Sequence, residues 1–247
     1  MRDLEGKVAV VTGAGRGFGK AFCAALAERG AQVVVADIDG AAAEAAAREI
    51  GPRAEALALD VADEAAVFAA MADVAKRHGG IDILINNAGI HSVAASKPIA
   101  QLGLAAARRM FEVNVWGVVH CTLAAMPFMK GRAGAAIVNI SSMASYPCTS
   151  TYGVTKLAVR GITTDFAREL GPDGIRVNAI APGLMFTDTI RAELPPEIVK
   201  GVMATQILQR EGAVEDIVAA MLYLVSPGAA FVTGECLRVS GGATLQV

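Results

Sequence analysis

The chain has few aromatic residues and a nearly balanced charge, and both features restrict the functions that it can have. Only 5% of its 247 residues are aromatic, whereas 54% are hydrophobic, so aliphatic side chains must fill the core. They are numerous enough for a large buried sheet. The formal net charge of −2 argues against nucleic acid or an anionic membrane surface as a partner.

Cysteines are few, and they are scattered along the chain. They form no C-x-x-C pair and show no metal-ligand spacing, so no metal site is predicted. This distribution is typical of reduced thiols in a cytosol. The four residues are Cys23, Cys121, Cys148 and Cys236.

Targeting and membrane signals are also missing. Asp3 and Glu5 stand where a signal peptide would be basic and then apolar. The most hydrophobic long window, from Val113 to Met129, is short for a bilayer span. It is also interrupted by Asn114, His120, Thr122 and Pro127. We therefore expect a soluble, cytoplasmic protein.

Short β-branched runs alternate with Ala-rich segments of helical periodicity. The helical segments cover residues 19–29, 41–50 and 63–78, among others. This alternation predicts βαβ units, and therefore an α/β fold with a doubly wound parallel sheet of about seven strands. Neither a linker nor a repeat divides residues 1–247, so we expect a single domain. The seven runs are KVAVVTG, QVVVADI, EALALDV, IDILINN, AAIVNIS, IRVNAIA and CLRVSGG.

A glycine-rich turn, TGAGRGFG at residues 12–19, follows the first run and opens a helix. Gly13, Gly17 and Gly19 fit G-x-x-x-G-x-G rather than G-x-G-x-x-G. Such glycines let the backbone approach a pyrophosphate at the helix start. Asp37 ends the second run, where an acid would hold the ribose hydroxyls of NAD. The turn alone is also compatible with another nucleotide or S-adenosylmethionine.

The stretch YGVTK places Tyr152 and Lys156 four residues apart. On a helix they would share one face. An ammonium group beside a phenol favours the phenolate, which an acid/base at neutral pH requires. Taken alone, the pattern more often belongs to an ordinary exposed helix face.

Several motifs occur together in a characteristic order, and the chain resembles the short-chain dehydrogenase/reductase family in its compact single-domain form. The resemblance implies a Rossmann-type fold, a nicotinamide cofactor and a small-molecule alcohol or ketone substrate. It also implies a homo-oligomer, a tetramer or dimer, formed through the helix of Tyr152 and the C-terminal strand. The motifs are TGAGRGFG, NNAG at 86–89, Asn114, NISS ending at Ser142, YGVTK and APG at 181–183.

The resemblance assigns four catalytic residues. Tyr152 would be the acid/base, and Lys156 would lower its pKa and hold the nicotinamide ribose. Ser142 would orient the substrate oxygen, although Ser141 is an alternative. Asn114 would anchor a water that relays protons, or it would simply satisfy backbone groups in a buried helix.

The resemblance also implies the cofactor contacts. Asp60 and Val61 would flank the adenine, and Asn87 would meet the adenosine ribose or brace a turn. Met185 and Thr187 would reach the carboxamide, although Thr187 is also a candidate helix N-cap. The full set is Gly13, Arg16, Gly17, Phe18, Gly19, Asp37, Asp60, Val61, Asn87, Tyr152, Lys156, Met185 and Thr187.

The substrate region is less clearly marked. Only ten residues separate Ser142 from Tyr152, which indicates a short loop at the mouth of the site. The long segment near 184–212 is predicted to be a lid. His91 is a candidate substrate contact, although a lone histidine is more often structural. The expected apolar walls are Leu184, Phe186, Ile190 and Met203 on the lid, with Met143 and Tyr146 opposite.

Cofactor choice is predicted from the charges near the ribose. Asp37 and Asp39 would repel the 2′-phosphate of NADP, and Arg16 alone opposes them. We therefore expect NAD, with NADP less favoured. Three alternatives remain open at this point: a cofactor sensor without turnover, a methyltransferase, and an NADP-dependent 3-oxoacyl thioester reductase.

Overall fold

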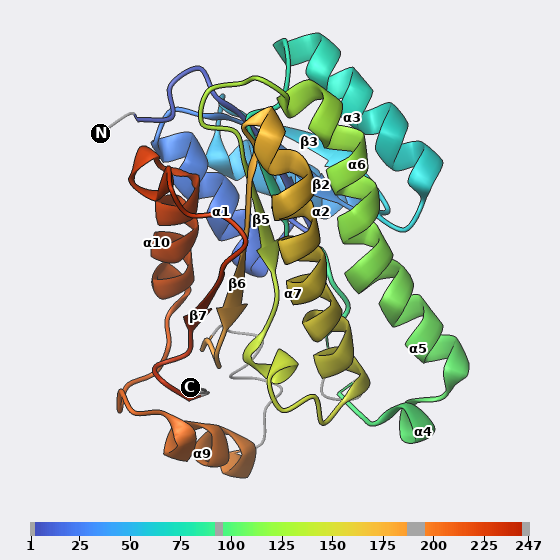
Figure 1. Cartoon of the computed structure of the whole chain (residues 1–247), viewed down its shortest axis with the longest axis vertical. Coiled ribbons are helices and arrows are strands. Elements are labelled where there is room, and N and C mark those ends of the chain that lie inside the picture. Colours follow the sequence, from blue (N-terminus) through green and yellow to red (C-terminus); the bar gives the residue numbers. More distant parts are fainter. Residues whose placement is uncertain (1–2, 92–95, 187–195, 244–247) are drawn as a thin grey trace.

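Seven parallel strands form one sheet in the order β3-β2-β1-β4-β5-β6-β7 (Figure 1). The computed structural model describes residues 3–91, 96–186 and 196–243. Every adjacent pair is parallel; Val10, for example, is in register with Val34 on β2 and Leu84 on β4. The predicted parallel sheet is confirmed. The strands are β1 Val8–Thr12, β2 Gln32–Asp37, β3 Ala54–Ala58, β4 Ile83–Asn86, β5 Ala136–Ile140, β6 Arg176–Pro182 and β7 Cys236–Val239.

Helices cover both faces of the sheet (Figure 1). Alternate strand residues enter two separate cores, so Val11 packs in one and Val10 in the other. This is why the central strands are continuous apolar runs. One face carries α1 Gly17–Glu28, α2 Gly40–Ile50 and α10 Val214–Val225, and the other carries α3 Glu64–His78, α6 Gly117–Met129 and α7 Thr151–Leu170.

The remaining elements lie in the connections. The short helices are α4 Ile99–Leu102, α5 Leu104–Phe111 and α9 Pro196–Thr205, and a π-helical turn spans Glu112–Trp116. Single 3-10 turns occupy Met143–Ser145, Gly171–Asp173 and Pro227–Ala229. The apolar window predicted at 113–129 is thus part π-turn and part α6. None of the described helices is long and apolar enough to cross a membrane.

Side-chain caps explain where several helices begin. Asp39 accepts a hydrogen bond from the Ala42 amide at 3.1 Å, and Asp63 accepts one from Ala66 at 3.0 Å. Such caps satisfy amides that have no partner within the helix. Because of them, the segments predicted at 41–50 and 63–78 form helices whose first residue differs from the prediction by one position.

The strand order reverses between β1 and β4, which opens a crevice at their carboxyl ends. Thr12, the last residue of β1, ties the two strands together there. Its hydroxyl accepts hydrogen bonds from the amides of Asn87 and Ala88, each at 3.1 Å. The glycine turn and the NNAG segment are therefore fixed side by side at the reversal.

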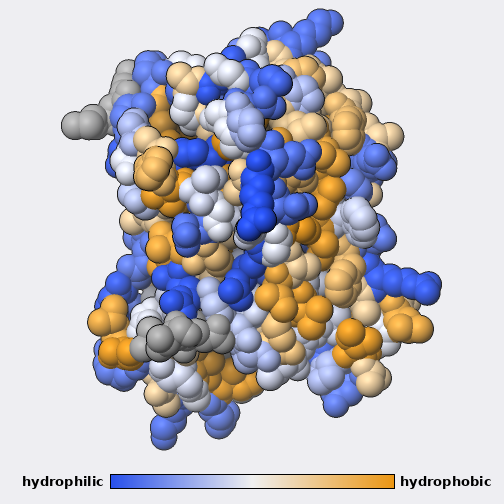
Figure 2. Space-filling view, viewed as in Figure 1, coloured by the Kyte–Doolittle hydropathy of each residue, from blue (hydrophilic) through white to orange (hydrophobic). Residues whose placement is uncertain are grey.

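Exposed apolar side chains are unevenly distributed over the surface. Figure 2 shows hydrophobic side chains over the N-terminal half of α7 and also over α6 and towards the left and right edges of the view, with hydrophilic residues between them. Leu157 of α7 is 44% exposed, and Phe231, just before β7, is fully exposed. Exposed apolar groups that cluster are candidates for an interface between protein chains.

Candidate active site

Two adjoining cavities lie at the carboxyl edge of the sheet. One, of about 500 Å³, lies between the glycine turn and the ends of β2 and β3. The other, of about 640 Å³, lies between α7, the segment after β6 and α9. Phe18, Asn87, Gly89 and His91 line both cavities, so the two join there. The described residues contain no group of three acidic, histidine or cysteine side chains that could hold a metal ion.

The first two turns of α7 carry Tyr152 and Lys156 into the second cavity. Ser150 caps this helix by accepting a hydrogen bond from the Gly153 amide at 3.1 Å. The Lys156 ammonium lies 5.8 Å from the centroid of the Tyr152 ring and donates to the Ile140 carbonyl at 2.8 Å. The predicted shared helix face is confirmed.

Burial shifts the pKa of both side chains, and for Tyr152 the shift is opposite to our prediction. Burial raises the pKa of Tyr152 to about 12, and the hydrogen bond with Ser142 offsets only part of this increase. Burial also lowers the pKa of Lys156 to about 8. The pKa of Tyr152 is therefore raised rather than lowered as expected, because loss of water outweighs the hydrogen bond with Ser142.

The two serines of NISS point in different directions. Ser142 bonds to the Tyr152 side chain, and its hydroxyl also accepts from the Ala144 amide at 3.1 Å. Ser141 is buried and donates to the Lys156 backbone carbonyl at 2.8 Å. The hydroxyl beside Tyr152 is therefore that of Ser142.

Asn114 is fully buried in the π-helical turn. Its amide oxygen accepts from the Ile90 amide at 2.6 Å, and its nitrogen donates to the Ile90 carbonyl and the Thr155 hydroxyl, each at 3.1 Å. The backbone-satisfying role considered above is thus present. Both the Asn114 oxygen and the Lys156 ammonium also flank Gly89, within 3.3 Å of where a β-carbon on Gly89 would lie.

The glycine turn forms a cradle that fits a dinucleotide phosphate. Gly17 has a φ of +57°, and a β-carbon there would meet nothing within 4 Å, so its backbone faces open space at the start of α1. A β-carbon on Gly13 would lie 2.7 Å from the Ala88 Cα, which excludes a side chain. Gly19 instead packs against Gly13 and the Asn87 amide, so it supports the turn from behind.

Asn87 also braces this turn, as one of the two interpretations proposed. Its side-chain nitrogen donates to the carbonyls of Thr12 and Gly13 at 3.0 and 2.8 Å. It lines both cavities as well. These bonds fix its orientation without removing it from the cavity wall.

Acidic and basic side chains face each other across the first cavity. Asp37 accepts from the Gly15 amide at 2.8 Å and the Asp39 amide at 3.0 Å. The cavity is further lined by Arg16, Ile38, Asp60, Val61 and Arg109. The side chains predicted to surround the adenosine, Asp37, Asp60 and Val61, are therefore brought together.

The second cavity has a mainly apolar wall that differs in part from the prediction. Met143 and Leu184 line it as predicted, and Met185, which is predicted to reach the carboxamide, lines it too. Helix α9 contributes Ile198 and Val202, four residues apart, rather than Met203. Phe186 is not among the described lining residues either. The predicted contacts Thr187 and Ile190 lie outside the described residues.

Tyr146 and His91 also depart from expectation. Tyr146 faces away from the cavity, with its ring between the guanidinium groups of Arg160 at 4.0 Å and Arg238 at 5.5 Å. Its assignment to the substrate wall was wrong. His91 lines the cavity, and its ring lies 4.5 Å from the Tyr152 ring, centroid to centroid.

The chain matches known proteins over nearly its whole length. Residues 13–244 match a family model described as enoyl-(acyl carrier protein) reductase. A probable short-chain type dehydrogenase/reductase of Bradyrhizobium diazoefficiens is 41% identical, with 100% of this chain and 90% of that protein covered. The chain belongs to the short-chain dehydrogenase/reductase family. Members of this family are oxidoreductases, so the predicted reaction class is confirmed.

Two further proteins are similar to this chain over nearly their whole length. The 7alpha-hydroxysteroid dehydrogenase of Escherichia coli K12 is 37% identical, over 99% of this chain and 96% of that one. A crystal structure of a putative D-mannonate oxidoreductase from Haemophilus influenza with bound NAD superposes with a TM-score of 0.91. It is 27% identical and covers 98% of this chain and 96% of its own.

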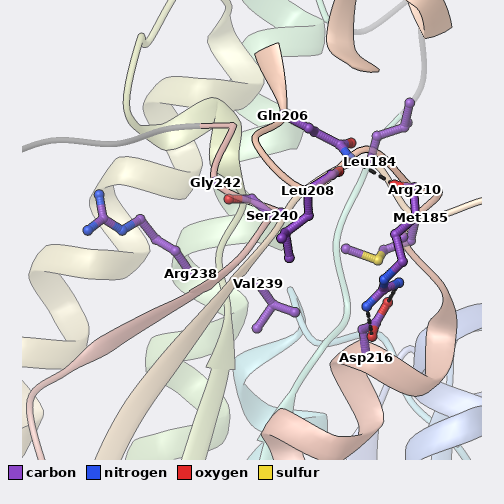
Figure 3. A pocket seen from close by; sticks show the side chains of 12 residues that line it. Leu184, Met185, Gln206, Leu208, Arg210, Asp216, Arg238, Val239, Ser240 and Gly242 are labelled. Atoms are coloured by element: carbon purple, nitrogen blue, oxygen red, sulfur yellow. Dashed lines mark hydrogen bonds and ion pairs between the residues drawn. The ribbon is translucent and has the colours of Figure 1, made fainter. Parts of the chain in front are cut away.

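In this dehydrogenase/reductase, hydrogen bonds and an ion pair hold the segment that lies behind the wall of the second cavity (Figure 3). A smaller cavity of about 290 Å³ lies behind Leu184 and Met185. Beside it, the Gln206 side chain donates to the Arg210 carbonyl at 2.9 Å, and Arg210 forms a two-pronged ion pair with Asp216, both bonds 2.7 Å. The segment that follows α9 is therefore attached to α10.

Reasoning from sequence missed several residues that line the cavities, among them Arg109, Ile198 and Val202. The spacing of Ile198 and Val202 follows the helical period and was available as a signal. Arg109 stands five residues before Asn114 and belongs to no motif, so only the fold reveals that it reaches the first cavity.

Proposed function

We propose that this protein transfers a hydride between NAD and a secondary alcohol or ketone. The observation that carries the proposal is the position of Tyr152 in the second cavity, hydrogen-bonded to Ser142, beside Lys156 and next to His91, which lines both cavities. When bound, the nicotinamide ring supplies the hydride chemistry, and the protein supplies position and proton transfer.

Each of the four residues has one task in this proposal. Ser142 holds the substrate oxygen near the Tyr152 hydroxyl, which takes the alcohol proton during oxidation or returns it during reduction. Lys156 holds the nicotinamide ribose, and in the loaded site its charge opposes the rise that burial causes in the pKa of Tyr152. Asn114 anchors a water that carries the proton from Lys156 towards solvent.

The proposed cofactor is NAD rather than NADP. Its support is Asp37, whose carboxylate is held by two backbone amides at the edge of the first cavity. A 2′-phosphate there would meet a fixed like charge. Arg16, which lines the same cavity, is the counter-argument.

The proposed substrate is an apolar secondary alcohol, and its support is the wall formed by Met143, Leu184, Ile198 and Val202. The similarity to a hydroxysteroid dehydrogenase agrees with this class. We further propose that the segment near 184–212 acts as a lid within a single domain. The protein is proposed to be a cytoplasmic homo-oligomer, most simply a homotetramer.

The test is NADH formation at 340 nm with NAD and a panel of secondary alcohols. The panel contains hydroxysteroids, alicyclic alcohols, sugars and hydroxyacyl thioesters, and an enoyl thioester is tested in the reverse direction because of the family model's description. Tyr152→Phe should lose about 10²-fold or more of the turnover but keep NADH binding.

Two outcomes would contradict the proposal. If the wild type binds NADH but turns over no panel member, a sensor becomes the better explanation. If Tyr152→Phe retains a third of the wild-type activity, the assignment of the acid/base fails.

A further inference from the structure

Arg109 forms an ion pair with Asp60, and both residues line the first cavity. It extends from α5 and donates from Nη2 to Asp60 Oδ2 at 2.8 Å. The other oxygen, Oδ1, accepts from the Ala62 amide at 3.0 Å. The carboxylate is therefore held from two sides, by a charged group and by the backbone.

Asp60 is a hydrogen-bond acceptor throughout the neutral range. Burial raises the pKa of Asp60, but the hydrogen bonds from Ala62 and Arg109 outweigh burial and lower it overall. An ionised carboxylate has about four acceptor positions and no donor. After the two bonds already made, it still has capacity for one donor from the cavity.

The ion pair is poorly suited to a purely structural role. The side chains of Arg109 and Asp60 are 47% and 33% exposed, and exposed pairs of this kind add little to folding stability. Both residues nevertheless line the cavity where the adenosine half of the cofactor is proposed to lie. An orienting role depends on geometry rather than on pair strength.

We propose that Arg109 is a positioning residue that holds Asp60 ready to accept a hydrogen bond from the exocyclic amine of adenine. The proposal rests on the proposed function only in that the cavity takes the adenosine of a dinucleotide. It predicts selection for an amino-bearing base over one with a carbonyl at the same position, because a carbonyl oxygen would face the carboxylate without a proton between them.

The experiment measures binding rather than turnover. Calorimetry gives the Kd of the full chain for NADH and for reduced nicotinamide hypoxanthine dinucleotide, in which a carbonyl replaces the amine. The variants are Arg109→Gln, Asp60→Ala and the double variant. Arg48→Gln is the matched control, because Arg48 pairs with Glu44 at 3.6 Å on α2 and does not line the cofactor cavity.

The wild type and Arg48→Gln should prefer NADH to the hypoxanthine analogue. Arg109→Gln should lose about three- to tenfold of that preference, the scale of one hydrogen bond. Asp60→Ala should lose all of it, and adding Arg109→Gln to Asp60→Ala should change nothing more.

Wild-type preference in Arg109→Gln would overturn the proposal, and so would an equal loss of affinity for both dinucleotides, which would indicate a general charge effect. Failure of the proposed function has a different signature. In that case NADH binding and its dependence on Arg109 would persist while no alcohol is oxidised.

Discussion

Tyr152 and Lys156 are both buried, yet burial shifts their pKa values in opposite directions. Burial favours the neutral form of each, so it raises the pKa of Tyr152 to about 12 and lowers the pKa of Lys156 to about 8. Below pH 8 the lysine is charged and the tyrosine is protonated. Each further rise in pH creates more phenolate while the ammonium is being lost.

This pair predicts a pH profile for the proposed reaction. Alcohol oxidation needs the phenolate, so its kcat/KM should still be increasing at pH 10, because the pKa of Tyr152 lies above that value. Carbonyl reduction needs the protonated phenol and should be fastest at lower pH. The measurement is kcat/KM in both directions from pH 6 to 10.5. An oxidation plateau below pH 9 would show that the Lys156 charge outweighs burial during the reaction.

Cofactor choice is a second prediction at the scale of one residue. Like charges about 4 Å apart repel by roughly 1–4 kcal/mol, which is about tenfold to several hundredfold in affinity. The wild type should therefore favour NAD over NADP by about tenfold or more, and Asp37→Ser should narrow the gap by admitting NADP. The check is kcat/KM for each cofactor at fixed substrate. Equal use of both by the wild type would assign control of the pocket to Arg16.

At the scale of elements, α7 and the turn at Met143–Ser145 meet at one glycine. A β-carbon on Gly153 would lie 2.5 Å from the Ala144 carbonyl oxygen, whereas one on Gly161 of the same helix would meet nothing within 4 Å. The contact at Gly153 fixes the turn that begins at Ser142 against the first turn of α7. The packing of the short loop between Ser142 and Tyr152 therefore requires a residue without a side chain at position 153.

Gly153→Ala should therefore displace this turn and lower kcat by about tenfold or more, since small misplacements of reacting groups are costly. NADH affinity should change little. The matched control, Gly161→Ala, should keep full activity and raise the free energy of unfolding by up to about 1 kcal/mol, because alanine is the better helix former. Steady-state kinetics measures kcat, and urea denaturation measures the free energy of unfolding. Equal kcat values in the two variants would contradict the role assigned to Gly153.

The elements themselves could largely be predicted from sequence, because strand and helix periods are local properties. The three-dimensional surroundings of a side chain could not be predicted in this way. The pKa of Tyr152 depends on burial by segments distant in sequence, and the four-residue spacing to Lys156 does not report that. Tyr146 turns away from the cavity because its ring makes cation–π contacts with Arg160 of α7 and Arg238 of β7. Helical spacing alone likewise does not specify which face of α9 meets the cavity.

For the whole molecule, the exposed apolar residues on α7 and near β7 predict self-association. Leu157 is 44% exposed on α7, and Leu237 on the edge strand β7 is 38% exposed. Leu157→Glu should reduce the molar mass measured by light scattering after size-exclusion chromatography. Phe68→Glu is the control, because Phe68 is 43% exposed on α3, which α6 separates from α7. A wild-type monomer, or equal effects of both changes, would refute the assignment.

The strand order also has a consequence for biosynthesis. β1 leaves the ribosome before the other six strands of the sheet, yet it lies inside the sheet between β2 and β4. β2 and β3 can pair with it early, but β4 begins at residue 83, 71 residues after β1 ends at 12. At about 5–20 residues per second, one edge of β1 has no partner for roughly four to fourteen seconds of translation. That edge is Val-rich, so the nascent chain is most exposed to mispairing before its last four strands exist.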